Sequence, residues 1–303
     1  MQASLTVLGS NSAAPTKSRN QSSYYLRIGS NRILLDCGEA TQKRLIENRI
    51  NYQKIQYILI SHLHGDHCLG LFGLLNTMSL NGRKSDLKIV GPKGIKDLLT
   101  TVRNLTGAHD TFEVDILELE PEENQSFTLG NLNVKAFPLS HRLPCFGYRI
   151  DAPEALPGLN IDACNQHEVP YTEYGKIKEG SDFTKPNGDI VPNEELVYTP
   201  ETPFSFGYIT DTLLRTDLAE AFETVQVLYH EATYLHNLID RAKRTFHSTA
   251  QEAAMFATQA SVNQPIIGHF SSRYADSISH LAEASTVFDN TSVALEGKTF
   301  EFH

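Results

Sequence analysis

Ser61-His62-Leu63-His64-Gly65-Asp66-His67 is the stretch that decides the fold. It places three imidazoles and one carboxylate within six residues, directly after the apolar run 54–60. Such a run predicts a buried strand, and α/β sheets bind ligands in the crevice beyond the carboxyl ends of their strands. Imidazole and carboxylate together suit Zn²⁺, so the stretch predicts a metal site at a sheet edge. The alternative is a surface loop that happens to be rich in histidine.

Strands and helices alternate along the rest of the chain, which predicts a layered α/β fold with helices on the outside. The predicted strands are 4–8, 23–28, 32–37, 54–60, 87–90, 112–118, 133–137, 146–150, 204–209, 225–230, 265–269 and 291–296. The predicted helices are 39–48, 68–80, 91–104, 213–222, 234–244, 249–261 and 276–288.

The segment 151–203 interrupts this alternation. It holds seven of the 13 prolines and few periodic apolar residues. We interpret it as an extended excursion, an inserted arm within a single domain that spans residues 1–303. The arm contains 11 acidic and 3 basic residues, which leaves 25 acidic and 23 basic residues elsewhere. The net charge of −10 therefore does not exclude a nucleic-acid partner for the body, although phosphate binding draws on Lys and Arg.

Composition indicates a packed protein in a reducing compartment. Hydrophobic residues make up 40% and charged residues 20% of the chain, as in ordinary globular proteins. No stretch of 18 apolar residues predicts a membrane span, and the start lacks the basic and apolar regions of a secretory signal. The cysteines have no CxxC spacing, so we expect a cytoplasmic protein; they are Cys37, Cys68, Cys145 and Cys164.

The motif His-Leu-His-Gly-Asp-His at 62–67 resembles the signature of the metallo-β-lactamase superfamily. Other segments, between about residues 6 and 275, narrow the likeness to the ribonuclease Z family of tRNA 3′-processing endonucleases. They are 9–16 (GSNSAAPT), 19–23 (RNQSS), 35–42 (LDCGEATQ), 140–142 (SHR), 210–212 (TDT), 230–233 (HEAT), 247–249 (HST) and 269–274 (HFSSRY). The resemblance implies a four-layer αββα sandwich with a protruding arm.

The resemblance also implies two Zn²⁺ ions per chain. One ion would be held by His62, His64 and His141, the other by Asp66, His67 and His269, and Asp211 would bridge them. From the residues alone, His141, Asp211 and His269 each follow an apolar strand and so reach the edge that the 62–67 loop occupies. Without the resemblance, the alternatives are a loop histidine, a helix N-cap before Thr212 and a core histidine, respectively.

Two metal ions clamp the attacking and leaving oxygens of a phosphoryl displacement, and a shared water supplies hydroxide as the nucleophile. By resemblance, Asp66 holds that water and accepts its proton. We expect His247 to donate a proton to the leaving 3′ oxygen, with Glu231 holding its imidazole in the charged form. The alternative for His247 is a structural place before a helix, because 248–251 and 249–252 both have capping-box spacing.

The leading hypothesis is a zinc-dependent endoribonuclease that removes the 3′ trailer from precursor tRNA and leaves a 3′-hydroxyl. A second hypothesis keeps the dizinc site but gives it a small substrate, such as a cyclic nucleotide, another phosphodiester, a thioester or a lactam. A third is a di-iron redox protein or a binding protein, which the resemblance disfavours because His64 is present and no ligand is missing.

The resemblance further implies a homodimer in which the arm of one subunit serves the active site of the other. Within the arm we expect Lys176 and Lys178 to lie at the tip and to bind precursor tRNA, with Tyr171 or Tyr174 beside them. The alternative is a solvated acidic loop that makes no contact with RNA.

Overall fold

The computed structural model of the protein describes residues 2–154, 157–198 and 202–302. The chain forms two compact units: a body, made of Met1–Asp151 and Phe204–His303, and an arm, Ala152–Pro203. Residues 155–156 and 199–201, which belong to the segment that the sequence assigns to the arm, lie outside the described residues. Within the described ranges, no helix has both the length and the apolar character that crossing a membrane requires.

The first sheet of the body has seven strands. In spatial order they are β20 (Thr299–Phe302), β1 (Ala3–Gly9), β3 (Ser23–Ile28), β4 (Asn31–Leu35), β5 (Tyr57–Leu59), β6 (Leu87–Pro92) and β7 (Val114–Leu119). The strands from β4 to β7 are parallel neighbours, so their carboxyl ends share one edge of the sheet. Asp36 and the 61–67 loop both leave the sheet at that edge, because they follow β4 and β5.

The second sheet also has seven strands. In spatial order they are β19 (Ser292–Val293), β17 (Gln264–Gly268), β16 (Val227–Glu231), β15 (Ser205–Ile209), β10 (Phe146–Asp151), β9 (Leu132–Pro138) and β8 (Gln125–Leu129). β15, β16 and β17 are parallel, and their carboxyl ends lead to Asp211, Glu231 and His269. Beyond that edge, β2 (Asn11–Ser12) pairs with β18 (Phe270–Ser271).

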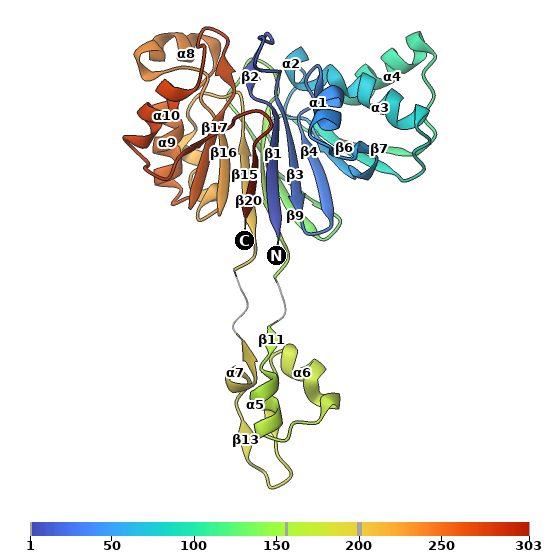
Figure 1. Ribbon diagram of the computed structural model, residues 1–303, viewed down its shortest axis with the longest axis vertical. Coiled ribbons are helices and arrows are strands. Elements are labelled where there is room, and N and C mark those ends of the chain that lie inside the picture. The colour runs from blue at the N-terminus through green and yellow to red at the C-terminus, as the bar shows by residue number, and fades with distance from the viewer. Residues whose placement is uncertain (1, 155–156, 199–201, 303) are drawn as a thin grey trace. The chain divides into compact units, whose positions relative to one another are not determined.

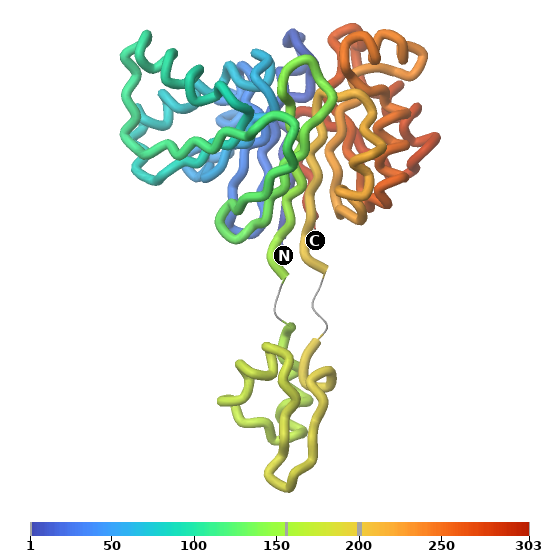
Figure 2. Tube along the Cα trace, turned by 180° about the vertical axis from the view of Figure 1, so that it is seen from behind, coloured from blue at the N-terminus to red at the C-terminus, as the bar shows by residue number. Residues whose placement is uncertain are grey.

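Buried tyrosines join the two sheets. Tyr24 of β3 contacts Tyr229 of β16 with ring centroids 4.4 Å apart, and Tyr208 of β15 stacks on Tyr229 at 5.1 Å. Helices cover the outer faces (Figures 1 and 2): α1 (Thr41–Glu47), α2 (Gly65–Cys68), α3 (Gly70–Leu80) and α4 (Ile95–Thr106) on the first sheet, and α8 (Ile239–Thr245), α9 (Ala250–Gln259) and α10 (Ile278–Ser285) on the second. The predicted four-layer αββα sandwich is confirmed.

The helices pack through apolar faces that the sequence pattern already indicates. Leu71, Leu74, Leu75 and Met78 of α3 are spaced as one helical face requires, and all are buried in the core beneath the first sheet. α9 begins at Ala250, and its N-cap Thr249 forms a capping box that Glu252 completes, which is one of the two predicted registers.

The structure separates the segment 152–203 from the body, but this arm has secondary structure and a small core of its own, which its few periodic apolar residues do not indicate. It contains β11 (Gly158–Leu159), α5 (Ile161–Gln166), α6 (Tyr174–Lys178), β12 (Phe183–Thr184), β13 (Ile190–Val191), α7 (Asn193–Leu196) and β14 (Val197–Tyr198). The core residues are Cys164, Val169, Ile177, Phe183, Val191 and Leu196. They come from short, separate elements and therefore produce no periodic pattern in the sequence.

The helix predicted over 213–222 is wrong. This segment forms two short 3₁₀ turns, Thr216–Leu218 and Glu220–Phe222. At its start, the Leu213 amide donates to the Ser140 carbonyl, which holds the chain against the loop after β9. The predicted helix at 68–80 is also divided, because α2 ends at Cys68 and α3 begins at Gly70.

Candidate metal centre and active site

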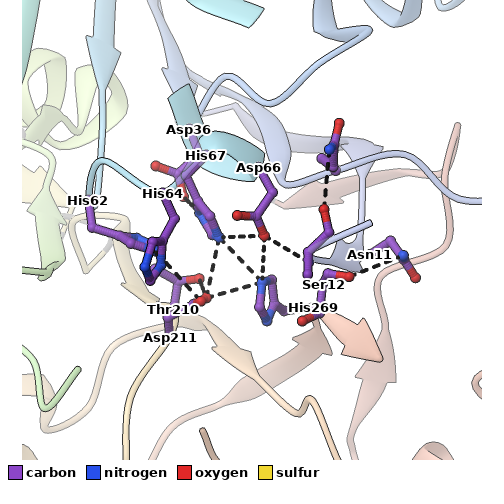
Figure 3. A network of polar contacts seen from close by, with 12 residues as sticks. Asn11, Ser12, Asp36, His62, His64, Asp66, His67, Thr210, Asp211 and His269 are labelled. Carbon is purple, nitrogen blue, oxygen red and sulfur yellow. Dashed lines mark hydrogen bonds and ion pairs between the residues drawn. The ribbon is translucent and has the colours of Figure 1, made fainter. Parts of the chain in front are cut away.

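The candidate site lies where both sheets end at the same edge. His62 and His64 lie in the loop after β5, and Asp66 and His67 in α2. The second sheet supplies the remaining candidate ligands, each just beyond a strand: His141 after β9, Asp211 after β15 and His269 after β17. Figure 3 shows side chains from the two sheets turned toward one another.

The structure brings all the predicted ligand residues together. Ligand atoms lie within 4.8 Å of one another in the group His62, His64, His141 and Asp211, and likewise in the group Asp66, His67 and His269. Asp211 connects the groups, since its Oδ2 atom is 3.7 Å from His62 Nε2 and its Oδ1 atom is 3.1 Å from His269 Nε2. These are the same two groups and the same connecting carboxylate that the sequence predicts.

Asp36 orients two of the imidazoles. It is fully buried, and its Oδ2 atom accepts hydrogen bonds from His67 Nδ1 at 2.7 Å, Tyr208 Oη at 2.7 Å and Ser61 Oγ at 2.9 Å. Because the Ser61 hydroxyl donates to Asp36, its oxygen can accept from His62 Nδ1, 2.9 Å away. The Nδ1 atoms therefore donate away from the cluster, and the Nε2 atoms of His62 and His67 face it, where a cation can bind them in place of a proton.

Backbone and hydroxyl groups orient two more imidazoles in the same way. His141 Nδ1 donates to the Phe246 carbonyl at 3.1 Å, and His269 Nδ1 donates to Thr233 Oγ1 at 2.9 Å. The Nε2 atoms of both rings then carry the lone pairs. Outer partners that hold the second ring nitrogen are typical of histidines that bind metal.

The arrangement of these nitrogens fits a divalent cation. His64 Nδ1 lies 2.9 Å from His62 Nε2 and 3.1 Å from His141 Nε2. Each separation fits an N–H···N hydrogen bond, and a cation bound among the three nitrogens would take the place of the shared proton. Buried imidazole and carboxylate groups without a thiolate form the donor set that a catalytic metal ion takes, so these residues can hold a divalent metal.

Electrostatics favour positive charge at the same place. Burial lowers the pKa of His67, but the carboxylates of Asp211, Asp66 and Asp36 outweigh burial and raise it well above its usual range. Burial raises the pKa of Asp211, yet the surrounding imidazoles, with His269 first, hold it well below its usual range. The Asp211 carboxylate is thus ionised at neutral pH and attracts cations.

His247 and Glu231 form a pair beside the cluster. His247 lies between α8 and α9, and its Nδ1 atom is 2.9 Å from Oε1 of Glu231, the last residue of β16. Burial lowers the pKa of His247, but the carboxylates of Glu231 and Asp211 outweigh burial and raise it to about 9. The ring is therefore protonated at neutral pH and can donate a proton.

A pocket of about 270 Å³ opens onto the cluster. Its walls are Ser12, Ala13, His64, Gly65, Asp66, His141, Arg142, Asp211, Thr245 and His247. The Ala13 amide donates to Asp66 Oδ2 at 2.8 Å, so the loop between β2 and β3 restrains this carboxylate. The pocket gives a ligand access to the candidate ligands and to His247 at once.

Lys176 and Lys178 belong to the arm and not to this cluster. Both lie on α6, which contacts β11, and Lys176 Nζ forms an exposed ion pair with Glu173 at 2.9 Å. The turn at the end of the arm opposite β11 is instead the one between β12 and β13, which carries Lys185 (Figure 1). The expectation that Lys176 and Lys178 lie at the tip of the arm is wrong.

The sequence assigns no role to Asp36 and Thr233, although both lie in motifs that carry the family resemblance. Asp36 directly follows β4, next to the strand that precedes the histidine loop, but a turn aspartate can take the same position, so its contact with His67 is what identifies it. The Thr233 hydroxyl donates to Glu231 Oε2 and accepts from His269 Nδ1. It thereby links the His247–Glu231 pair to the candidate metal ligands.

Comparisons with known proteins identify the family of the chain. Residues 3–155 match the family model described as "Anti-Pycsar protein Apyc1". Ribonuclease Z of Bacteroides fragilis strain YCH46 is 38% identical over 294 residues, which cover 96% of each chain. The crystal structure of the short form of human tRNase Z superposes with a TM-score of 0.71 at 26% identity, with 98% of each chain covered. The metallo-β-lactamase fold protein YhfI of Bacillus subtilis, 18% identical with a TM-score of 0.72 over 100% of each chain, shares the fold. The chain belongs to the ribonuclease Z family.

Proposed function

We propose that this protein removes the 3′ trailer from precursor tRNA by metal-dependent hydrolysis of one phosphodiester bond, which leaves a 3′-hydroxyl on the tRNA. The observation that carries the proposal is the meeting of the imidazole and carboxylate cluster with the His247–Glu231 pair at one pocket. Family membership adds the substrate class, since the curated relatives are ribonuclease Z enzymes.

The proposed cofactor is two Zn²⁺ ions per chain. His62, His64 and His141 would hold one ion, Asp66, His67 and His269 the other, and Asp211 both. The imidazole-rich donor set supports zinc over harder cations such as Mg²⁺. Such a metal pair supplies an acidified water as the nucleophile and offsets the charge that develops on the phosphate.

Asp66 is the proposed acceptor of the proton that the attacking water loses. Its Oδ2 atom is restrained by the Ala13 amide, and its side chain lines the pocket. Burial raises the pKa of Asp66, but His67 and His269 outweigh burial and hold it below the usual range, so the group is ionised and able to accept.

His247 is the proposed general acid. It lines the same pocket as Asp66, and Glu231 stabilises its protonated form. A poor leaving group such as the 3′ oxygen of a ribose needs a proton as the P–O bond breaks. Thr233 bonds to Glu231 and restrains the orientation of that carboxylate, so Glu231 and Thr233 are positioning residues.

The arm is proposed to bind precursor tRNA away from the cut, with Lys176 and Lys178 as contacts. Both side chains are exposed on one short helix, which supports access to a phosphate backbone. The arm has a core of its own, so it can present these residues on a folded surface. The 11 acidic residues of the segment 151–203 would repel the phosphates of tRNA, so tRNA binding by the arm has to be measured directly.

We also propose a homodimer that acts in the cytoplasm. Exposed apolar side chains on α1, at the start of α3, at the end of α3 and on α4 support an interface; they are Ile46, Leu69, Leu80 and Leu105. Four free and buried cysteines support a reducing compartment. Light scattering after size exclusion tests the dimer, with Leu80→Glu as the variant that should shift it to the monomer.

The experiment that tests the function is incubation of the zinc-loaded protein with a precursor tRNA that carries a 3′ trailer, followed by mapping of both product ends. We expect a tRNA with a 3′-hydroxyl and a trailer with a 5′-phosphate, and no product from Asp66→Ala. A parallel reaction with a cyclic nucleotide tests the alternative of a dizinc phosphodiesterase for small substrates. Turnover of the cyclic nucleotide with intact precursor tRNA would reject the proposal in favour of that alternative.

A further inference from the structure

Arg142 stands at the mouth of the active-site pocket without a partner. It follows His141 in the loop between β9 and β10, and its side chain is exposed. Of the described residues that line the pocket, Arg142 is the one lysine or arginine. Its guanidinium forms no ion pair or hydrogen bond with any residue that the structure describes. A cation in this position is free to bind an anion that enters the pocket.

The loop that carries Arg142 is anchored at its base. The Leu139 amide donates to the Cys145 carbonyl at 2.8 Å and closes the loop. The Ser140 amide donates to Thr212 Oγ1 at 3.0 Å, which ties the loop to the segment after Asp211. Arg142 and the two residues after it project from this base as an exposed tip. The backbone that carries Arg142 is therefore anchored next to the candidate metal ligands His141 and Asp211.

Arg142 lines the same pocket as four of the candidate metal ligands, which are His64, Asp66, His141 and Asp211. A phosphate group at the mouth of the pocket would lie between this fixed charge and the cluster.

The pocket is too small to hold both the scissile phosphate and the phosphates next to it. At about 270 Å³ it lies near the lower limit of roughly 300 Å³ for small-molecule sites. A polynucleotide whose scissile phosphate reaches the cluster must therefore cross the rim with the phosphates next to it. Arginine matches the planar, bidentate geometry of phosphate oxygens better than lysine does.

We propose that Arg142 binds a phosphate adjacent to the scissile one, and thereby favours polynucleotides over isolated phosphodiesters. The inference rests on the proposed function, because it assumes that a polynucleotide is the substrate. It assigns Arg142 to substrate binding, and it leaves water activation and protonation of the leaving group to Asp66 and His247. The phosphate belongs either to the tRNA side of the cut or to the trailer side.

The test compares Arg142→Ala with the unchanged protein on precursor tRNA and on bis(p-nitrophenyl) phosphate, which has a single phosphate. We expect kcat/KM on precursor tRNA to fall about 10- to 100-fold, the usual effect of losing a hydrogen bond to a charged group. The loss on the small ester should be smaller by about 10-fold or more. The slope of log affinity against log salt should become shallower by about 0.7 to 0.9.

Two controls sharpen the result. Arg142→Lys keeps the charge and should retain the salt slope; a lysine variant with the slope of the alanine variant would contradict a phosphate contact. Arg27→Ala removes an arginine that pairs with Glu301 on β20, and it should leave both activities unchanged. Arg27 opposes Arg32 at the start of β4, so it lies at the edge of the sheet opposite the site.

Precursor tRNAs with one-nucleotide and longer trailers locate the phosphate. An effect of Arg142→Ala on both substrates assigns it to the tRNA side, and an effect that needs the longer trailer assigns it to the trailer side. Equal losses on precursor tRNA and on bis(p-nitrophenyl) phosphate, or lower zinc content, would overturn the inference and make Arg142 a support of the metal centre. If the unchanged protein cleaves precursor tRNA and the alanine variant cleaves it equally well, the inference fails while the proposed function stands.

Discussion

His247 Nδ1 lies 2.9 Å from Glu231 Oε1, and the Glu231 side chain is fully buried while that of His247 is 12% exposed. One ring nitrogen is thus held by a buried carboxylate, and the ring itself lines the pocket. A buried partner of opposite charge keeps an imidazole protonated and fixes its direction. The pair has the geometry of a general acid and the residue that positions it.

His247→Ala should lower the rate more on substrates with a poor leaving group than on an activated aryl ester. A general acid contributes typically about 10²–10⁴-fold, and its contribution grows with the basicity of the leaving oxygen. The measurement is kcat on precursor tRNA and on bis(p-nitrophenyl) phosphate under saturating zinc. Equal losses on the two substrates would show that His247 positions the phosphate rather than donating a proton.

Glu231→Gln should produce the same substrate pattern with a smaller loss, because the imidazole stays while its stabilising charge is removed. The carboxylate also accepts from the Thr212 amide at 2.7 Å, so the variant should lose about 1–3 kcal/mol of stability. Thermal melting measures that structural part. The ratio of kcat on precursor tRNA to kcat on bis(p-nitrophenyl) phosphate isolates the effect on proton donation, since a purely structural loss would leave this ratio unchanged.

Asp36→Asn should weaken zinc binding about 10- to 100-fold, the usual effect of losing an outer partner of a metal-binding histidine. Asp36 has φ of 54°, a conformation that asparagine tolerates, so the variant tests the charge and not the backbone. Competition with a chromophoric chelator gives the affinity. Tyr208→Phe is the matched control, because it removes one donor to Asp36 and leaves the contact with His67 intact. If the Asp36→Asn variant bound zinc as tightly as the unchanged protein, Asp36 would not be the residue that orients His67 for metal binding.

Much of this site could be predicted because its residues follow strands. Parallel strands of one sheet end at the same edge, so the residues after β15 and β17 must lie at one edge of the second sheet, as the loop after β5 lies at one edge of the first. The packing of the two sheets then brings these two edges together. The role of Asp36 could not be predicted from its position alone, because a single aspartate after a strand is equally common as a turn residue. It becomes visible only when its contact with His67 is known.

The errors in the fold have a common physical cause, which is that local pattern does not report distant partners. The segment 213–222 has apolar spacing that fits a helix, but Leu213 bonds to Ser140, far away in the sequence. In the arm, Cys164, Ile177 and Leu196 belong to three different short helices and still share one core. No window of sequence contains enough of these contacts to predict them.

His280 should make the protein less stable in mild acid. It is fully buried against the rings of Phe270 and Tyr274, and burial together with the nearby Arg19 lowers its pKa to about 4. The unfolded chain binds a proton below about pH 6.5 whereas the folded chain does not until about pH 4, so stability falls as the pH decreases through that window. Between pH 7 and pH 5 the expected loss is about 2 kcal/mol.

Urea unfolding of the metal-free protein and of His280→Phe at both pH values measures this contribution. Between pH 7 and pH 5, the His280→Phe variant should lose about 2 kcal/mol less stability than the unchanged protein, since phenylalanine has no group that titrates. Other groups titrate equally in both proteins and cancel in the comparison. Identical acid sensitivity of the two proteins would show that His280 is not responsible.

Removal of the arm should separate recognition of tRNA from hydrolysis. Asp151 of β10 pairs directly with Ser205 of β15, so residues 152–203 can be replaced by a short Gly-Ser turn without disturbing either strand. The body keeps every candidate ligand and the His247–Glu231 pair, and it should retain most of its turnover of bis(p-nitrophenyl) phosphate. Cleavage of precursor tRNA should fall severely, because the proposed contacts distant from the cut are gone.

Lys176→Ala/Lys178→Ala in the full chain should weaken tRNA binding and make its salt dependence shallower by up to about two phosphate contacts. Glu194→Gln/Glu195→Gln, which changes the charge of α7 in the same arm, is the control for a general effect of the arm's field. If the protein without the arm cleaved precursor tRNA as fast as the full chain, the body would have to recognise the tRNA. Among the described residues that line the pocket, Arg142 is the one basic side chain that could do so.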